Sequence, residues 1–308
     1  MSDKKPLGLV VGETADLPQS FTQKNGIEVV QFEVNFPEDI SDRNPRKNFY
    51  ARMRQGEIPK TAQPPVGQYL KAFRAALDKF DQILVIIMTG DLSGALQSSQ
   101  QAKRRMPEEE QAKVHIIDSR LASVAEGLVC WKAQELIKAG KDTIEIVGYL
   151  ESIKKAEELI AEGKNPEQIL GFEPLEIGSL GLLESAKWLE IGGRISHADA
   201  VKAEIAKKIG MRAAITLKHG KVEGVGKKGV KFSPRGVVAS LLGEIKRARQ
   251  QLGPDMKIAI AHADVSKKQL QKLIMGIRDM RVELLFVSEI TPVLGTYSGP
   301  GTILIAWI

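Results

Sequence analysis

The amino-acid sequence predicts an α/β protein with two domains: a first domain with a mainly parallel sheet flanked by helices, and a second domain with a mixed or antiparallel sheet and helices. Three observations support this fold class. The chain has 308 residues, roughly twice the length of a typical domain. Short β-branched runs alternate with amphipathic segments in the first half, as they do in parallel sheets covered by helices. The second half contains a hairpin pattern, which indicates antiparallel pairing.

The first half contains four predicted strands and four predicted helices. The strands are short apolar runs at residues 8–11, 28–32, 83–88 and 114–117. The helices have apolar residues at helical spacing and cover about residues 66–80, 94–106, 120–139 and 143–162. The sequence Glu162-Gly163-Lys164-Asn165-Pro166 stops the last helix and has the composition of a linker. We therefore expect domains at residues 1–166 and 167–308.

The second half begins with a predicted hairpin, in which His219-Gly220 joins residues 211–217 to residues 221–225. A helix is expected to open at Ser233-Pro234, and strands follow at residues 257–261, 282–287 and 303–307. Residues 224–229 have the glycine spacing of a dinucleotide-binding loop, but no helix opens directly on these glycines. We interpret this segment as a flexible basic loop.

The excess of positive charge lies in the last third of the chain. The sequence has 44 lysine and arginine residues against 38 acidic residues, a net charge of +6, and residues 201–308 alone hold 19 basic and 8 acidic side chains. Aromatic residues make up only 5%, and they do not interleave with basic residues as they do on surfaces that stack bases. We therefore expect no nucleic-acid partner, and a docking surface for an acidic partner is the alternative.

Cysteine content and hydropathy bear on the location of the protein. Cys130 is the single cysteine, so neither an internal disulfide nor a cysteine metal cluster is expected, which fits a reducing cytosol. The longest fully apolar runs, residues 83–88 and 303–308, have six residues, whereas a membrane-spanning helix needs about 20. The apolar run at residues 7–11 is too short for an export signal. We expect a cytoplasmic protein without a metal site.

Two hydroxyl side chains stand at predicted helix entries. Ser93 lies between the most apolar strand and a helix, at the carboxyl end of a parallel strand, where open α/β sheets bind ligands. Thr61 precedes a helix that Pro64 and Pro65 open. Each side chain could simply cap its helix, with Ser93 as the N-cap residue. Alternatively, both could contact one anionic ligand, because helix N-termini attract anions.

His262 ends an apolar strand, where a buried imidazole would need a polar partner. A structural role and a role in a site are equally open for it. With Ser93 as nucleophile and Asp264 as orienting acid, His262 could also act as the general base of an enzyme. No Gly-x-Ser-x-Gly elbow, Walker loop or His-Glu-x-x-His sequence is present, so the common hydrolase and nucleotide-binding motifs are absent from the sequence.

Six short motifs follow one another along nearly the whole chain. They are Thr14-Ala15-Asp16-Leu17-Pro18, Thr61-Ala62-Gln63-Pro64, Leu92-Ser93-Gly94 with Gln97-Ser98, Ile117-Asp118-Ser119 with Gly127, Gly192-Gly193-Arg194-Ile195-Ser196, and Gly299-Pro300-Gly301. Taken together and in this order, the motifs resemble those of the DegV family of bacterial fatty-acid-binding proteins, the acyl-carrying subunits of a fatty acid kinase.

The resemblance implies an EDD-type fold, in which two α/β domains enclose a long-chain fatty acid such as palmitate at their interface. It implies that Thr61, Ser93 and His262 bind the carboxylate. It also implies that Arg194 lies at the surface near the head group, where the family engages its kinase and stabilises the acyl phosphate. The kinase would supply ATP, so this chain would be a substrate-binding carrier and not an enzyme. Transient contact with a membrane is compatible with this role.

The sequence departs from the family pattern in four short segments. Residues 11–13 read Val-Gly-Glu where the family has Thr-Asp-Ser, and Ala62 replaces a serine. Thr89 and Gly90 replace paired serines, and Tyr297-Ser298 stands where the family has a histidine before Gly-Pro-Gly. Several polar positions around the expected head group are therefore altered in this chain.

Overall fold

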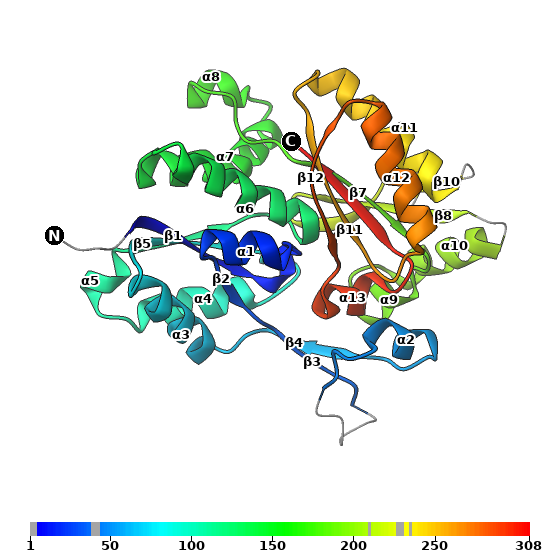
Figure 1. The fold of residues 1–308 in the computed structure, drawn as a ribbon, viewed down its shortest axis with the longest axis horizontal. Coiled ribbons are helices and arrows are strands. Elements are labelled where there is room, and N and C mark those ends of the chain that lie inside the picture. The colour runs from blue at the N-terminus through cyan, green and yellow to red at the C-terminus, as the bar shows by residue number, and fades with distance from the viewer. Residues whose placement is uncertain (1–4, 38–43, 209–210, 226–230, 234–235) are drawn as a thin grey trace.

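The computed structural model describes residues 5–37, 44–208, 211–225, 231–233 and 236–308 (Figure 1). The strands are β1 (Lys5–Gly12), β2 (Glu28–Val30), β3 (Glu33–Asn35), β4 (Lys60–Ala62), β5 (Phe80–Ile87), β6 (Val114–Asp118), β7 (Gly178–Leu183), β8 (Arg212–Lys218), β9 (Lys221–Gly224), β10 (Lys231–Ser233), β11 (Lys257–His262), β12 (Glu283–Glu289) and β13 (Ile303–Trp307). The helices are η1 (Glu13–Ala15), α1 (Gln19–Asn25), α2 (Phe49–Arg54), α3 (Val66–Leu77), α4 (Ala95–Arg104), α5 (Glu108–Gln111), α6 (Ser123–Lys138), α7 (Thr143–Ala161), α8 (Pro166–Leu170), α9 (Lys187–Ile191), α10 (His197–Lys208), α11 (Val237–Leu252), α12 (Lys267–Asp279) and α13 (Pro292–Ser298).

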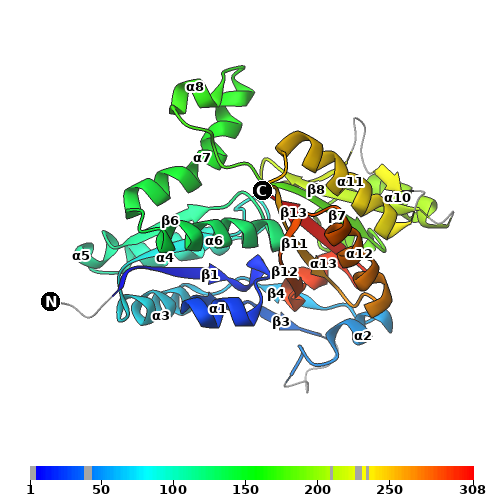
Figure 2. The same cartoon turned by 45° about the horizontal axis from the view of Figure 1, so that its top comes forward.

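The first sheet holds four parallel strands in the order β2-β1-β5-β6. Side chains 83–87 of β5 are all buried, as expected for a strand covered on both faces. Helices α3 and α4 lie on one face of the sheet, and α6 and α7 lie on the other (Figures 1 and 2). The predicted parallel sheet is confirmed, and each predicted strand and helix of the first half is present with slightly shifted ends. For example, α3 ends at Leu77 because Phe80 already begins β5.

The second sheet is mixed, as predicted. Its strand order is β10-β8-β7-β13-β11-β12, and β9 also pairs with β8. Strands β11 and β12 run parallel, whereas the other neighbours pair antiparallel. The predicted hairpin is confirmed, because β8 and β9 are joined by His219 (φ 50°) and Gly220 (φ 79°), the two left-handed residues that such a tight turn needs. The sequence does not predict β7, which contains no β-branched residue.

Two expectations for the second half fall on residues outside those that the structure describes. They are the start of a helix at Pro234 and most of the glycine loop, residues 226–229. Within the described residues, α11 begins at Val237 with Gly236 as its N-cap residue. No described helix combines the length and the apolar character needed to cross a bilayer.

The two faces of the second sheet carry side chains of different size. Ala259, Ala261 and Ala306 belong to the same hydrophobic core as the first sheet. Ile258 and Ile260 belong to the core under α11 and α12. Alternate residues of a strand point to opposite faces, so small side chains at every second position let α6 pack closely on β11 and β13. The core of the first sheet is therefore continuous with one face of the second.

A short ribbon of β3 and β4 carries the chain from the first sheet towards the second (Figure 1). At its far end, α2 packs against α13. There, the Tyr50 hydroxyl donates a hydrogen bond to the Ile290 carbonyl at 2.6 Å. The ribbon thereby places Thr61, in β4, beside α13.

Candidate ligand site

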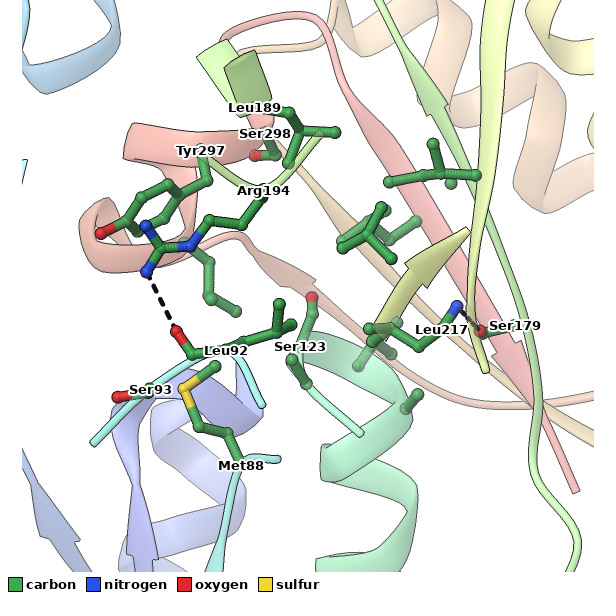
Figure 3. Close-up of a pocket in the computed structure, with 18 of the residues that line it drawn as sticks. Met88, Leu92, Ser93, Ser123, Ser179, Leu189, Arg194, Leu217, Tyr297 and Ser298 are labelled. Atoms are coloured by element: carbon green, nitrogen blue, oxygen red, sulfur yellow. Dashed lines mark hydrogen bonds between the residues drawn. The ribbon is translucent and has the colours of Figure 1, made fainter. Parts of the chain in front are cut away.

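A cavity of about 280 Å³ is lined by residues of the second sheet, of α6 and α13, and of segments that follow strands of the first sheet. Its volume is close to the lower end of the range for small-molecule sites, ~300–1,000 Å³. Most of the lining is apolar and comes from both halves of the chain, for example from Met88, Leu92, Val124, Leu180 and Leu304. Figure 3 shows Ser93, Arg194 and Tyr297 gathered on one side of this cavity and Leu217 and Ser179 on the other. The cavity therefore has a polar end with a positive charge, which we call the head end.

Thr61 lies at the head end and does not cap a helix. The N-cap residue of α3 is Pro65, which has no side-chain cap. Instead, the Thr61 hydroxyl forms a hydrogen bond with the Tyr297 hydroxyl at 2.6 Å, in which either oxygen can donate. A polar contact from β4 to α13 thus joins residues far apart in the sequence, and capping does not explain the position of this hydroxyl.

Ser93 lines the same cavity, at the entry to α4. The expectation that Ser93 is the N-cap residue is wrong by one position, because Gly94 is the N-cap residue of α4. The Ser93 oxygen accepts a hydrogen bond from the Ala95 amide at 3.2 Å. Its own hydroxyl proton is not used in that bond, so Ser93 can still donate to a ligand. The structure therefore brings Thr61 and Ser93 to one cavity, as their positions at two helix entries suggested.

Arg194 is the one charged side chain among the described residues that line the cavity. Its Nη2 donates to the Leu92 carbonyl at 3.0 Å, and its Nη1 donates to the Gly192 carbonyl. The guanidinium also lies over the ring of Tyr297, 4.2 Å from the ring centroid. These contacts hold a half-buried cation at the head end, on the second-half side of the cavity.

His262 is not among the residues that line this cavity. It follows Ile258 and Ile260 at alternate positions of β11, so its side chain projects to the face that α11 and α12 cover. Burial lowers the pKa of His262 despite the nearby carboxylates of Glu289 and Asp264. Its Nδ1 has no hydrogen-bond partner among the described residues. The structure therefore does not bring His262 together with Thr61, Ser93 and Arg194.

Two residues at the head end are not identified by the sequence motifs. Tyr297 and Ser298 both line the cavity from the last turn of α13. In the sequence, these two residues could have been noticed by their position directly before Gly-Pro-Gly, where the family pattern has a histidine. Among the described residues, the buried Ser298 hydroxyl has no hydrogen-bond partner.

The β8–β9 hairpin lines the opposite end of the cavity, through Leu217 among others. Two residues of the first half hold its turn in place. The Thr89 hydroxyl donates to the Gly220 carbonyl at 3.0 Å, and Arg120 donates to the His219 carbonyl at 2.8 Å. A Cβ atom on Gly220 would approach the Thr89 hydroxyl to 2.6 Å, so the turn fits this contact only as glycine. The first half of the chain thereby holds the turn of this hairpin in place.

A buried carboxyl group lies behind the cavity wall and joins three segments of the chain. Asp16 accepts a hydrogen bond from the Ser123 hydroxyl at 2.5 Å and another from the Thr291 amide at 2.7 Å. Burial raises the pKa of Asp16 from 3.8 to about 7, although these two hydrogen bonds oppose the rise. Burial also raises the pKa of Glu126 well above its ordinary value, and the Thr14 hydroxyl donates to Glu126 at 3.3 Å.

Metal binding finds no support in the described part of the chain. No group of histidine, cysteine and acidic residues there has the arrangement of a metal site. Cys130 is buried in α6, and burial raises the pKa of its thiol.

The fold and the cavity together define an α/β binding protein whose apolar cavity ends in a cluster of hydroxyl groups and one arginine. A sequence profile described as "Uncharacterised protein, DegV family" matches residues 6–162 and 153–308. The chain belongs to the DegV family.

Individual relatives are similar over nearly their whole length. Protein DegV of Bacillus subtilis is 23% identical over 308 residues, which cover 98% of each chain. A stearic-acid-binding protein from Eubacterium ventriosum superimposes with a TM-score of 0.77 at 19% identity, covering 98% of each chain. A DegV family protein from Thermus thermophilus, described for its fatty acid binding, superimposes with a TM-score of 0.73 at 23% identity, covering 98% of this chain and 99% of that one. These structures confirm the predicted fold class.

Proposed function

We propose that this chain binds a long-chain fatty acid such as palmitate in the cavity between its two parts, predicted as domains 1–166 and 167–308. We propose further that it presents the carboxylate to a partner kinase, which forms an acyl phosphate. The observation that carries the proposal is the apolar cavity with Thr61, Ser93 and Arg194 gathered at one end. A similar structure described as a stearic-acid-binding protein and a DegV family protein described as loaded with heptadecanoic acid support the same ligand class.

The apolar lining explains how a lipid chain is kept in a water-soluble complex. Each methylene group transferred from water to an apolar environment contributes ~0.8 kcal/mol, so an enclosed long chain gains on the order of 10 kcal/mol. A bilayer offers the chain nearly the same environment. The acyl chain of the ligand therefore contributes little free energy to extraction from a membrane. The contacts of the head group must supply that free energy.

The head end has the groups that a carboxylate needs. An ionised carboxylate buried without partners is strongly disfavoured. Thr61 and Ser93 offer hydroxyl donors from the first half, and Arg194 offers a positive charge from the second half. The same guanidinium would face the added charge of an acyl phosphate, which is the role we assign to Arg194 in contact with the kinase. ATP and the groups for phosphoryl transfer would come from that kinase.

The alternative function, an enzyme with a serine nucleophile and a histidine base, requires Ser93 and His262 to meet. Ser93 lines the cavity, whereas His262 projects to the other face of the second sheet. No contact in the described structure therefore favours this alternative, and we propose the carrier function alone.

Two matched substitutions test the carboxylate site. Ser93→Ala is expected to lower the affinity of the delipidated protein for hexadecanoic acid by about 1–3 kcal/mol, because one buried carboxylate oxygen loses its donor. His262→Ala is expected to leave the affinity unchanged, because its side chain lies outside the cavity. Isothermal titration measures both. Equal affinities for wild type and Ser93→Ala, or a marked loss in His262→Ala, would contradict the proposed site.

The kinase step has a separate readout. The protein loaded with hexadecanoic acid, a purified kinase of the fatty acid kinase class and ATP are incubated with hydroxylamine, which traps an acyl phosphate as a hydroxamate. We expect hydroxamate only when all three components are present. Absence of hydroxamate with an active kinase would contradict the kinase part of the proposal while leaving fatty-acid binding intact.

A further inference from the structure

The buried Asp16 carboxyl contacts the cavity wall through a single hydroxyl group. The Ser123 hydroxyl donates to Asp16 at 2.5 Å, and Ser123 itself lines the cavity from the first turn of α6 (Figure 3). Asp16 also accepts a hydrogen bond from the Thr291 amide, at 2.7 Å. Thr291 is the N-cap residue of α13, whose last turn lines the head end. Asp16 therefore joins the start of α6 to the start of α13 directly behind the cavity.

The backbone conformation on both sides of the Asp16–Ser123 hydrogen bond is unusual. Asp16 has φ 46° and Ser123 has φ 56°, both in the left-handed region that residues other than glycine rarely adopt. The turn η1 before Asp16 packs tightly on α6, where a Cβ atom on Gly127 would approach the Ala15 carbonyl to 2.5 Å. Unfavourable conformations of this kind persist where surrounding contacts impose them, and they are concentrated at functional sites.

The groups whose charges act on Asp16 are acidic, or neutral at physiological pH. They are Glu13 of η1, Glu126 of α6 and Tyr50 of α2. Arg46 forms an ion pair with Glu13, at 2.7 Å. The other elements that pack against η1, β1 and α13, carry one titratable side chain each, and both stand at the end away from Asp16: Lys5 and Tyr297. These surroundings favour the protonated form of Asp16.

The two protonation states of Asp16 change what Ser123 offers to the cavity. As a carboxylate, Asp16 accepts the Ser123 hydroxyl proton, so Ser123 presents only lone pairs to a ligand. As a carboxylic acid, Asp16 donates its own proton to the Ser123 oxygen, and the Ser123 hydroxyl is free to donate towards a ligand. Burial raises the pKa of Asp16 to about 7, so both states are populated near neutral pH.

We propose that the binding of a fatty acid is coupled to the uptake of a proton by Asp16, which rests on the proposed function. A ligand carboxylate brings a negative charge into the low-dielectric region in front of Asp16, and two negative charges there repel each other. Protonation of Asp16 removes this repulsion and frees the Ser123 hydroxyl. The protein therefore binds the carboxylate more tightly when Asp16 is protonated, and it releases the ligand more readily as the pH rises through neutrality. Asp16 is a positioning residue, because it acts on the ligand through Ser123.

Isothermal titration of the delipidated full-length protein with dilute hexadecanoic acid tests this coupling. The free ligand stays ionised above about pH 6, because a carboxylic acid in water titrates at about pH 4–5. The affinity of the wild-type protein should fall about threefold or more between about pH 6 and pH 8. Titrations at about pH 7.5 in two buffers of different ionisation enthalpy should show the uptake of about half a proton or more per bound ligand.

Two variants and a control separate Asp16 from other sources of a pH effect. Asp16→Asn resembles the protonated acid, since an amide can donate to Ser123 and accept from Thr291. This variant should keep its affinity constant over the same pH range and take up no proton. Ser123→Ala removes a hydrogen bond that lowers the pKa of Asp16, so the fall in affinity should move to higher pH. Asp199→Asn removes a carboxylate of α10 and should follow the wild-type protein.

Proton uptake in Asp16→Asn equal to that of the wild-type protein would overturn the coupling and leave fatty-acid binding standing. Binding to the wild-type protein without proton uptake would have the same meaning. If Asp16→Asn does not fold, an unchanged pH profile in Ser123→Ala would overturn the coupling. If the wild-type protein bound no hexadecanoic acid at any pH, the proposed function itself would fail.

Discussion

Replacing Arg194 by leucine is expected to weaken binding of hexadecanoic acid roughly 10- to 150-fold. The reason is that Arg194 is the one charged side chain among the described residues that line the cavity. Hydrogen bonds to charged groups contribute ~1.5–3 kcal/mol, which corresponds to this range of affinities. Calorimetric titration of the delipidated variant gives the affinity directly.

Arg194→Lys is not expected to restore binding. A lysine keeps the positive charge but loses the planar group that lies over the Tyr297 ring and donates from two nitrogens to Leu92 and Gly192. Arg278→Leu, at an exposed position of α12, is the control for removing one positive charge from the second half. If Arg194→Leu weakened 1-hexadecanol and the acid equally, the residue would act through the shape of the cavity and not through its charge.

Asp16 is expected to contribute a loss of stability as the pH rises from about 4 towards 7, and Asp16→Asn should remove this contribution. The folded-state pKa of Asp16 is raised to about 7 by burial, against an ordinary value of 3.8. Between these two values the folded protein holds a proton that the unfolded chain has released. The stabilisation contributed by this proton is therefore fully present below the pKa of Asp16 in the unfolded chain. It is lost as the pH rises through the pKa of Asp16 in the folded protein.

The expected size of this effect is large. One such group changes the free energy of unfolding by up to ~1.4 kcal/mol per pH unit. Glu126, whose pKa is also raised by burial, acts in the same direction, so Asp16→Asn should reduce the slope between pH 5 and 7 without abolishing it. Urea unfolding at several pH values measures the slope. Asp199→Asn should leave it unchanged over this range, because hydrogen bonds from Ser196 and Lys202 lower the pKa of that group. A slope in Asp16→Asn equal to that of wild type would contradict the assignment.

The first sheet is predictable from the sequence because its strands are buried on both faces. A run such as residues 83–88 is apolar at every position, which identifies a central parallel strand. The β8–β9 hairpin is predictable from its two-residue turn. By contrast, β7 lacks β-branched residues, and β3 and β4 have only three residues each. Their pairing depends on tertiary contacts, which local sequence preference does not contain.

The candidate site is predictable for residues near strand ends and helix entries, and less so elsewhere. Ser93 lies at the cavity because it follows β5, at the carboxyl end of a parallel strand, and Thr61 reaches the same cavity from β4 of the antiparallel β3–β4 ribbon. For His262 the alternation of β11 carried the relevant signal: alanines occupy the face towards the first sheet, and His262 shares the opposite face with Ile258 and Ile260. Tyr297 is marked in the sequence only by its position before Gly-Pro-Gly, and its contacts with Gly192 and Arg194, about a hundred residues earlier, follow from the tertiary packing.

The lipid content of the purified protein tests the central claim most directly. Organic extraction of full-length protein from an expression host, followed by mass spectrometry, is expected to return a long-chain fatty acid at about one molecule per chain. Protein delipidated by the same extraction and refolded should take up added hexadecanoic acid to the same ratio. Several independent preparations that contain no fatty acid, together with no uptake of the added acid, would contradict the proposal that this cavity holds a fatty acid.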